Sequence, residues 1–190
     1  MPLFTVVGVI GFLVVLVILW AVVIYNSFVR NKNMMGEAWS GIDVQLKRRH
    51  DLIPNLVQAV QGYMQHEKQL LENIAKYRSQ SMATTSVQSK ADAEGQISQG
   101  LRQLFAVAES YPDLKANQNF LDLQTKLTEV EDQLQLARRY YNGTVRNFNI
   151  LVGSFPSSLI ASKFNFTEAP YFQIEAGEGA VPDVKFASPS

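Results

Sequence analysis

Few residues in this 190-residue sequence have the types and spacing that catalysis or metal binding requires. The dipeptide His66-Glu67 begins like the zinc-protease motif H-E-x-x-H, but Leu70 stands where the second histidine would bind the metal. The sequence has one other histidine, His50, and on a single helix the two imidazoles would lie about 24 Å apart on nearly opposite faces. They cannot share a metal ion there. The sequence therefore predicts no catalytic residue, no metal site and no cofactor.

The composition excludes further classes of protein. The absence of cysteine rules out disulfide frameworks, thiol catalysis and iron–sulfur clusters. Because 17 Lys and Arg balance 17 Asp and Glu, the chain lacks the basic excess of nucleic-acid-binding proteins. With 47% hydrophobic residues it can bury a core. The sequence thus indicates architecture and location more clearly than activity.

The first 25 residues are almost entirely apolar, and the first charged side chain is Arg30. A helix of this length crosses the hydrocarbon layer of a bilayer, which is roughly 30 Å thick. A cleaved signal peptide would need a basic start and a small-x-small cleavage site, and neither is present. We therefore predict a retained transmembrane signal anchor over residues 1–29 with the lipid bilayer as its partner. Its anchoring side chains include Leu3, Phe12 and, at headgroup level, Trp20 and Tyr25.

The flanking charges predict an orientation. The N-terminal side of the apolar segment has no Lys or Arg, whereas Arg30 and Lys32 follow it. The positive-inside rule then leaves a short N-terminus outside and the rest of the chain in the cytoplasm. This arrangement is that of a single-pass membrane protein.

Residues 30–163 show helical periodicity. From Met35 to Tyr77 apolar residues alternate in steps of three and four, with Arg49 and Glu67 on the same seam. We expect a kink at Pro54 that shifts the seam and lets Arg49 point to solvent. The alternative is a buried Arg49 with a hydrogen-bonded partner. Residues 80–89 (QSMATTSVQS) have the composition of a loop.

A second helix is predicted before Pro112, a third over 120–151 with an apolar residue every seventh position, and a short fourth over 157–163. Short connections require antiparallel neighbours. The predicted fold is all-α: a transmembrane helix, then an elongated antiparallel bundle of three long helices and a short fourth, with a coiled-coil-like seam. The predicted interior of the bundle comprises Trp39, Ile42, Leu46, Ile53, Tyr63, Leu127, Leu134 and Tyr141.

Residues 164–190 have a different pattern, with short apolar runs separated by Gly and Pro. This pattern is typical of extended segments, which are marginal alone and need a surface to pack on. They can dock on the same chain, which we favour, or add to a neighbouring protomer. The candidate oligomer or partner contacts are Tyr171, Phe172, Ile174, Val184 and Phe186.

Several long motifs resemble the LemA family. They are AWSGIDVQLKRR at 38–49, DLIPNLV at 51–57, AESYPDLKAN at 108–117, ARRYYN at 137–142 and VPDVKF at 181–186. The resemblance implies a bacterial membrane-anchored protein with a short outer N-terminus, an antiparallel four-helix bundle, and no established catalytic activity or cofactor. A relative in magnetosome-forming bacteria is associated with building membrane compartments, which favours a structural role.

Two functional hypotheses follow. The first is a non-catalytic scaffold, not an enzyme, that forms a homo-oligomer or recruits a membrane-protein partner; an adaptor for a membrane protease or transporter is a variety of it. The second is an enzyme or enzyme subunit that uses charged residues of the bundle: Arg49, Asp51, Glu67 and Arg138. The absence of a recognisable group of perturbed titratable residues favours the scaffold.

Overall fold

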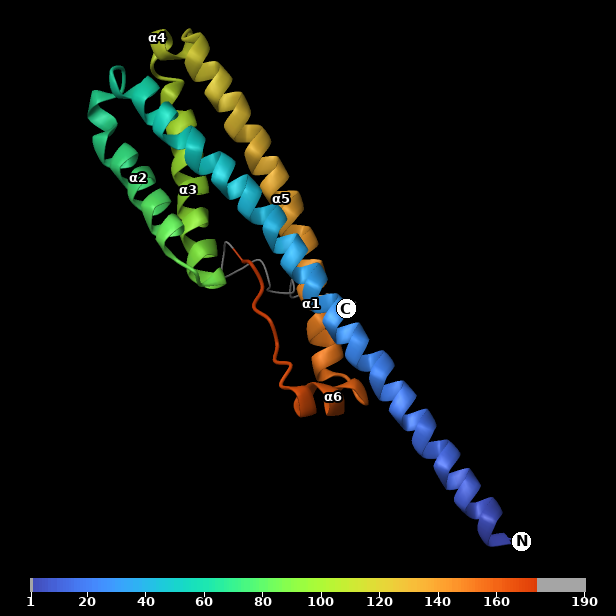
Figure 1. Cartoon of the computed structure of the whole chain (residues 1–190). Helices are drawn as coiled ribbons and strands as arrows, with labels where there is room; N and C mark the ends of the chain where they lie inside the picture. The colour runs from blue at the N-terminus through green and yellow to red at the C-terminus, as the bar shows by residue number, and fades with distance from the viewer. Residues whose placement is uncertain (1, 174–190) are drawn as a thin grey trace, which may run out of the picture. The chain divides into compact units, whose positions relative to one another are not determined.

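The computed structural model describes the backbone of residues 2–173, and over this range the fold is an all-α helical bundle with an N-terminal apolar helix, as predicted. Its elements are α1 (Pro2–Gln61), the 3-10 helix η1 (Gln65–Glu67), α2 (Lys68–Ala83), α3 (Val87–Ala108), α4 (Pro112–Lys115), α5 (Gln118–Gly153) and α6 (Ser157–Phe164) (Figure 1).

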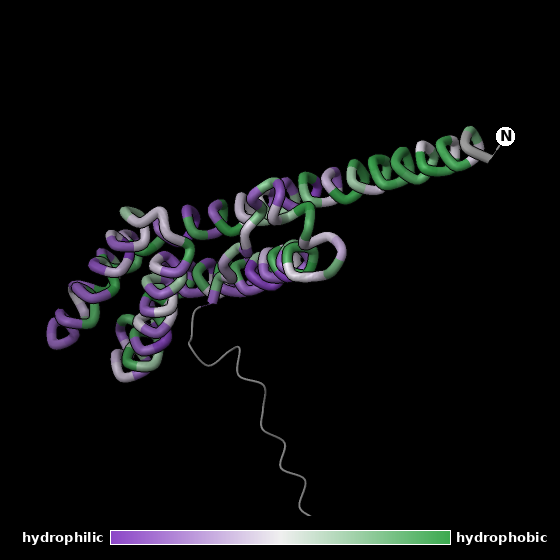
Figure 2. The backbone as a smooth tube through the Cα atoms, turned by 90° about the horizontal axis from the view of Figure 1, so that it is seen from below, coloured by the Kyte–Doolittle hydropathy of each residue, from purple (hydrophilic) through white to green (hydrophobic). Residues whose placement is uncertain are grey.

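The N-terminal part of α1 is apolar on all sides (Figure 2). This helix is long and apolar enough to cross a membrane, and every described side chain from Phe4 to Trp20 is exposed. Phe12 and Trp20 belong to this exposed set, whereas Tyr25 packs on the ring of Phe164. Leu3 lies in the first turn of α1, outside the described side chains.

The first predicted helical segment is divided, because α1 ends at Gln61 and α2 begins at Lys68. Placing Tyr63 in the core was therefore wrong. It lies in the turn after α1, where its ring is 40% exposed, and Met64 takes the buried position instead. The predicted loop over 80–89 is also shorter than expected. It shrinks to Thr84–Ser86, and the Ser86 hydroxyl caps α3 by accepting a hydrogen bond from the Ser89 backbone N–H.

Contacts along the chain define two compact units. Unit 1 contains the described residues up to Arg48 together with Glu129–Tyr171. Unit 2 contains Arg49–Thr128 with Phe172 and Gln173. Helices α1 and α5 are therefore each divided, with one segment in unit 1 and another in unit 2.

In unit 1, α1 and α5 run antiparallel, which follows from the pairs Arg48–Glu129, Trp39–Tyr141 and Phe28–Phe148. The interior positions Ile42, Leu46, Leu134 and Tyr141 are buried, and Trp39 is half-buried with its ring edge on Tyr141. A second apolar cluster joins α1, α5, α6 and the segment after α6 through Phe28, Phe148, Ala161 and Phe166.

The segment after α6 docks on α5 of the same chain. Asn149 donates its side-chain amide to the Ala169 carbonyl (3.0 Å) and accepts from the Ala169 N–H (2.9 Å). The Tyr141 hydroxyl donates to the Pro170 carbonyl (3.1 Å). Phe164, predicted in an extended segment, instead ends α6, where Asn165 adopts a left-handed conformation with φ of 57°.

In unit 2, α2 and α3 lie side by side along the C-terminal part of α1 (Figure 1). The core includes Ile53 and Leu56 of α1, Ile74 of α2, Leu104 of α3 and Leu127 of α5. Helices α2 and α3 approach closely at Gly100, where an added Cβ would lie 2.8 Å from Ile74 Cγ1. A glycine is therefore needed at this crossing.

Candidate functional site

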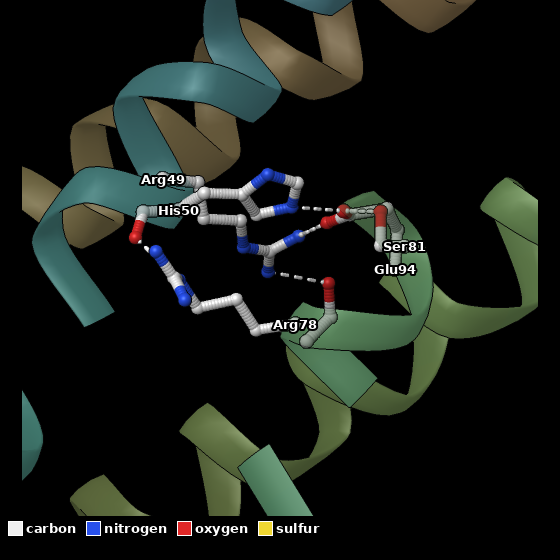
Figure 3. A network of polar contacts seen from close by, with 6 residues as sticks. Arg49, His50, Arg78, Ser81 and Glu94 are labelled. Carbon is white, nitrogen blue, oxygen red and sulfur yellow. Dashed lines mark hydrogen bonds and ion pairs between the residues drawn. The ribbon is translucent and has the colours of Figure 1, made fainter. Parts of the chain in front are cut away.

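Unit 2 contains a buried polar cluster built from three helices. Arg49 and His50 come from α1, Arg78 and Ser81 from α2, and Glu94 and Ser98 from α3 (Figure 3). Arg49 is 1% exposed and Glu94 is 0% exposed. Isolated charges are rarely buried this deeply, so the partners of these two side chains determine what the cluster can do.

Glu94 is the centre of the cluster, because its carboxylate bonds to both other helices. Its Oε2 accepts from Arg49 Nη1 at 3.0 Å. Its Oε1 lies 2.6 Å from His50 Nε2 and accepts from Ser81 Oγ at 2.5 Å. A carboxylate offers only acceptors, so the His50 bond requires a proton on Nε2.

Two further bonds involve the arginines. Arg49 Nη2 donates to Ser98 Oγ at 2.7 Å, one helical turn after Glu94 on α3. Arg78 Nε donates to the His50 backbone carbonyl at 2.7 Å and so joins α2 to α1. The cluster thus joins α1, α2 and α3 to one another through hydrogen bonds and an ion pair.

Burial alone would raise the pKa of Glu94. The hydrogen bond from His50, the positive charge of Arg49 and the hydrogen bond from Ser81 outweigh that penalty and hold the pKa below its ordinary value of 4.5. The carboxylate is therefore stabilised in its charged form inside the bundle.

The expected outward position of Arg49 is wrong. Pro54 lies inside an uninterrupted α1, and buried residues continue through it from Ile42 and Leu46 to Ile53 and Leu56. Because the seam keeps its phase, Arg49 remains on the buried face. The alternative of a paired, hydrogen-bonded Arg49 is the one that the structure shows.

The cluster contains serine, histidine and glutamate, but their order differs from that of a catalytic triad. In a triad the serine hydroxyl bonds to the histidine, which removes its proton. Here Ser81 bonds directly to the carboxylate, and both Ser81 and Glu94 are fully buried. A cavity of about 340 Å³ is lined by Val57, Met64 and Leu71 among others, and by none of the cluster residues. This arrangement holds helices together and presents no nucleophile.

The enzyme hypothesis also named Asp51, Glu67 and Arg138, and these residues are not part of the cluster. Asp51 is exposed on α1, and Glu67 accepts a 3.4 Å hydrogen bond from the Tyr111 hydroxyl. Arg138 belongs to unit 1. Within the described part of the chain, no three His, Asp or Glu side chains gather in a way that could hold a metal ion.

Glu94 was missed by sequence reasoning. Glu94 lies one turn before Ile97 and two turns before Leu101. This spacing places it on the apolar stripe of α3, where an acidic residue is unexpected. A seam arginine on one helix and a stripe glutamate on another are together the sequence signal of a buried pair.

The lowered pKa of Glu94 predicts a pH dependence of stability. Since the folded state holds this proton less tightly than the unfolded state, the contribution of Glu94 is complete above pH of about 4.5 and is lost as the pH falls through its lowered pKa. Urea titrations of the full chain in mild detergent, followed by circular dichroism, should show a decreasing free energy of unfolding below that pH. In Glu94→Gln this component should be absent, whereas Glu72→Gln, at an exposed position of α2, should keep it. Equal slopes in all three proteins would contradict the assignment.

Of the five candidate partner contacts, the structure describes Tyr171 and Phe172, while Ile174, Val184 and Phe186 lie outside the described residues. Tyr171 is partly buried. Phe172 is 0% exposed within its own chain, so its assignment as a contact open to a partner was wrong.

The chain is similar to a LemA protein and to magnetosome proteins. Protein LemA of Metamycoplasma hominis is 29% identical over 149 residues, which cover 78% of this chain and 68% of that protein. Magnetosome protein MamQ 2 of Paramagnetospirillum magneticum is 23% identical over 175 residues, and magnetosome protein MamQ of Magnetospirillum gryphiswaldense is 20% identical over 174. Both alignments cover 78% of this chain, which spans 64% of the length of these magnetosome proteins.

Residues 38–186 match the LemA family. The match includes the motifs at 38–49, 108–117 and 181–186, and it covers α1 from residue 38 onward and the whole of α5. The resemblance seen in the sequence is thereby confirmed: the chain belongs to the LemA family.

Proposed function

We propose that this protein is a non-catalytic helical scaffold, anchored in the bacterial inner membrane by α1, that self-assembles through the outer face of α5. The proposed topology is single-pass, with the N-terminus outside and the bundle in the cytoplasm, and it is supported by Arg30 and Lys32 after the apolar segment. Two observations support a structural role. The side chains of the polar cluster are buried and bond to one another, and α5 exposes apolar side chains.

The observation that carries the proposal is a stripe on the outer face of α5 in unit 1. Leu136, Tyr140 and Ile150 are each more than half exposed. At 100° per residue they fall within about 80° of one another, on the side of the helix opposite Leu134, Tyr141 and Phe148. Their spacing is that of a heptad seam, which suits packing against a second helix. We call Leu136, Tyr140 and Ile150 the α5 stripe.

The α5 stripe is the apolar part of a mixed surface. The same side of the helix carries Glu129, Asp132 and Arg139, and Gly143 and Asn147 occupy the seam positions between Tyr140 and Ile150. Grouped apolar side chains on an exposed helix mark interaction sites more often than scattered ones do. Two relatives are magnetosome proteins, which supports a membrane-associated role for this chain.

The mass of the full chain in mild detergent tests this function. We expect light scattering on a sizing column to give a discrete oligomer, and replacement of all three stripe residues by serine should reduce it to a monomer. Met82→Ser, at a similarly exposed apolar position on α2, is the matched control and should leave the oligomer intact. A monomeric wild-type chain, or an oligomer unaffected by the triple replacement, would contradict self-assembly through α5.

A truncation separates the contribution of the C-terminal residues. Removal of 174–190 keeps every residue that the structure describes, including the buried Phe172. A change in the number of protomers would assign part of the assembly to the removed residues. If the α5 stripe carries the contact, we expect this truncated chain to form an oligomer with the same number of protomers as the wild type.

A further inference from the structure

Three exposed apolar side chains lie in α6 or directly before it. Phe155, just before the helix, is 82% exposed, Leu159 is 60% exposed and Phe164 is 52% exposed. Leu159 lies on the outer face of α6, opposite Ala161, which packs in the apolar cluster of unit 1. Exposed apolar residues of this size grouped around one short helix require a partner that removes them from water.

The position of α6 along α1 identifies the partner. The ring of Phe164 lies 4.8 Å from that of Tyr25, and Phe166 stacks on Phe28 at 4.6 Å. Helix α6 therefore lies beside the turn of α1 where the apolar segment ends, between Tyr25 and the first charge at Arg30. In a membrane-spanning helix this turn lies at the level of the headgroups.

The register of α5 gives the same level independently. Phe148 packs against Phe28, and α5 continues toward the N-terminal end of α1 for five more residues to Gly153, about 7.5 Å. The end of α5 thus lies beside the turn that contains Tyr25, and Phe155 follows it.

We propose that α6, with Phe155, Leu159 and Phe164, is a second membrane contact that lies in the interfacial layer of the bilayer next to α1. An apolar face with a basic residue at its edge is the pattern of such helices, and Lys163 is exposed one turn after Leu159. Arg30 and Lys32 of α1 are also exposed and follow the turn that contains Tyr25. The contact is continuous with the anchor and fixes the base of the bundle against the membrane. It rests on the proposed membrane insertion of α1.

Site-directed spin labelling tests this contact, because the native chain has no cysteine and each single-cysteine variant carries one label. Phe155→Cys and Leu159→Cys report on α6. Val15→Cys reports on the anchor, and Val44→Cys is the aqueous control, since it is 63% exposed on the same helix and about 28 Å beyond Tyr25. The full-length variants are reconstituted in vesicles of phosphatidylcholine and phosphatidylglycerol. The accessibility of each label to oxygen, which concentrates in lipid, is compared with that to a water-soluble nickel chelate.

We expect the ratio of oxygen to nickel accessibility at positions 155 and 159 to be several-fold higher than at 44 and lower than at 15. Ratios at 155 and 159 equal to that at 44, with position 15 in lipid, would overturn the α6 contact and leave the anchor intact. A water-like ratio at position 15 would overturn the anchor and the α6 contact together. Low access to both reagents at 155 and 159, with broadening between like labels, would show that a second copy covers α6 and would also overturn the proposal.

Discussion

Glu94→Gln is expected to destabilise the protein by about 3–5 kcal/mol, because it removes the single negative charge at the centre of the buried cluster. The amide keeps the shape of the carboxylate, so little packing is lost. Arg49, 1% exposed, would then lie in the bundle without its ion-pair partner. The free energy of unfolding from urea titrations of the full chain in mild detergent measures this loss.

The double variant Arg49→Met, Glu94→Gln separates the cost of an unpaired charge from the net worth of the pair. Removing both charges should restore a large part of the lost stability, since the main cost of breaking a buried ion pair is the uncompensated charge that remains, and the double variant leaves none at these two positions. Arg48→Met is the matched control on the adjacent residue. Arg48 pairs with Glu129 at 3.7 Å with both side chains half-exposed or more, so its loss should cost about 1 kcal/mol or less.

Other outcomes would contradict this assignment. A Glu94→Gln variant as stable as wild type would show that the carboxylate is not held by Arg49 and His50. The single variant Arg49→Met completes the cycle. If the double variant loses the sum of the losses in Arg49→Met and Glu94→Gln, Arg49 and Glu94 do not interact, because coupled residues in contact are non-additive.

This cluster also shows where sequence reasoning reached its limit. Local periodicity correctly put Arg49 on a seam, but its partner is 45 residues away in the sequence and on another helix. Nothing within one helical segment indicates whether a seam arginine turns outward or finds a carboxylate. A kink at Pro54 would have turned Arg49 to solvent, where it needs no partner. That expectation led to the wrong position for Arg49.

The long helix α5 was predictable because its signal is local. An apolar residue recurs every seventh position from Phe120 to Phe148, and no Gly or Pro breaks the pattern before Gly143. Leu127, Leu134 and Tyr141 are accordingly buried. The membrane-length apolar helix was predictable for the same reason, since composition and length alone define it.

The end of α1 at Gln61 was not predictable from the same pattern. Apolar spacing continues through the turn into α2, so a seam drawn from Met35 to Tyr77 crosses a chain reversal without interruption. Gly62 is the local signal of a break, and it favours a turn only weakly against helix. The choice of Met64 over Tyr63 for the core is made by that turn.

Phe28→Ala is expected to destabilise the protein by about 3–5 kcal/mol, the range for removing a buried aromatic side chain. Phe28 is 0% exposed and lies between two rings. Phe166 stacks on it at 4.6 Å with 8° between planes, and Phe148 meets it edge-on at 5.9 Å and 83°. The three rings come from α1, the segment after α6, and α5, so the cavity would open where these parts of unit 1 meet.

Hydrogen exchange of the full chain in mild detergent gives the regional readout for this variant. Because Phe166 loses its stacking partner, we expect faster exchange in residues 157–171, although Asn149 still bonds to Ala169 and Tyr141 to Pro170. Met82→Ala is the control that truncates an exposed apolar side chain, and at 58% exposure it should change the free energy of unfolding by less than about 0.5 kcal/mol. Equal effects of the two substitutions, or faster exchange confined to α2 and α3, would contradict the assignment of Phe28 as the residue that fixes α6 and the following segment beside α1. If the assignment holds, the same side chain that stabilises unit 1 also sets the depth of Phe155 and Leu159 relative to Tyr25, since α6 reaches α1 through Phe164 and Phe166.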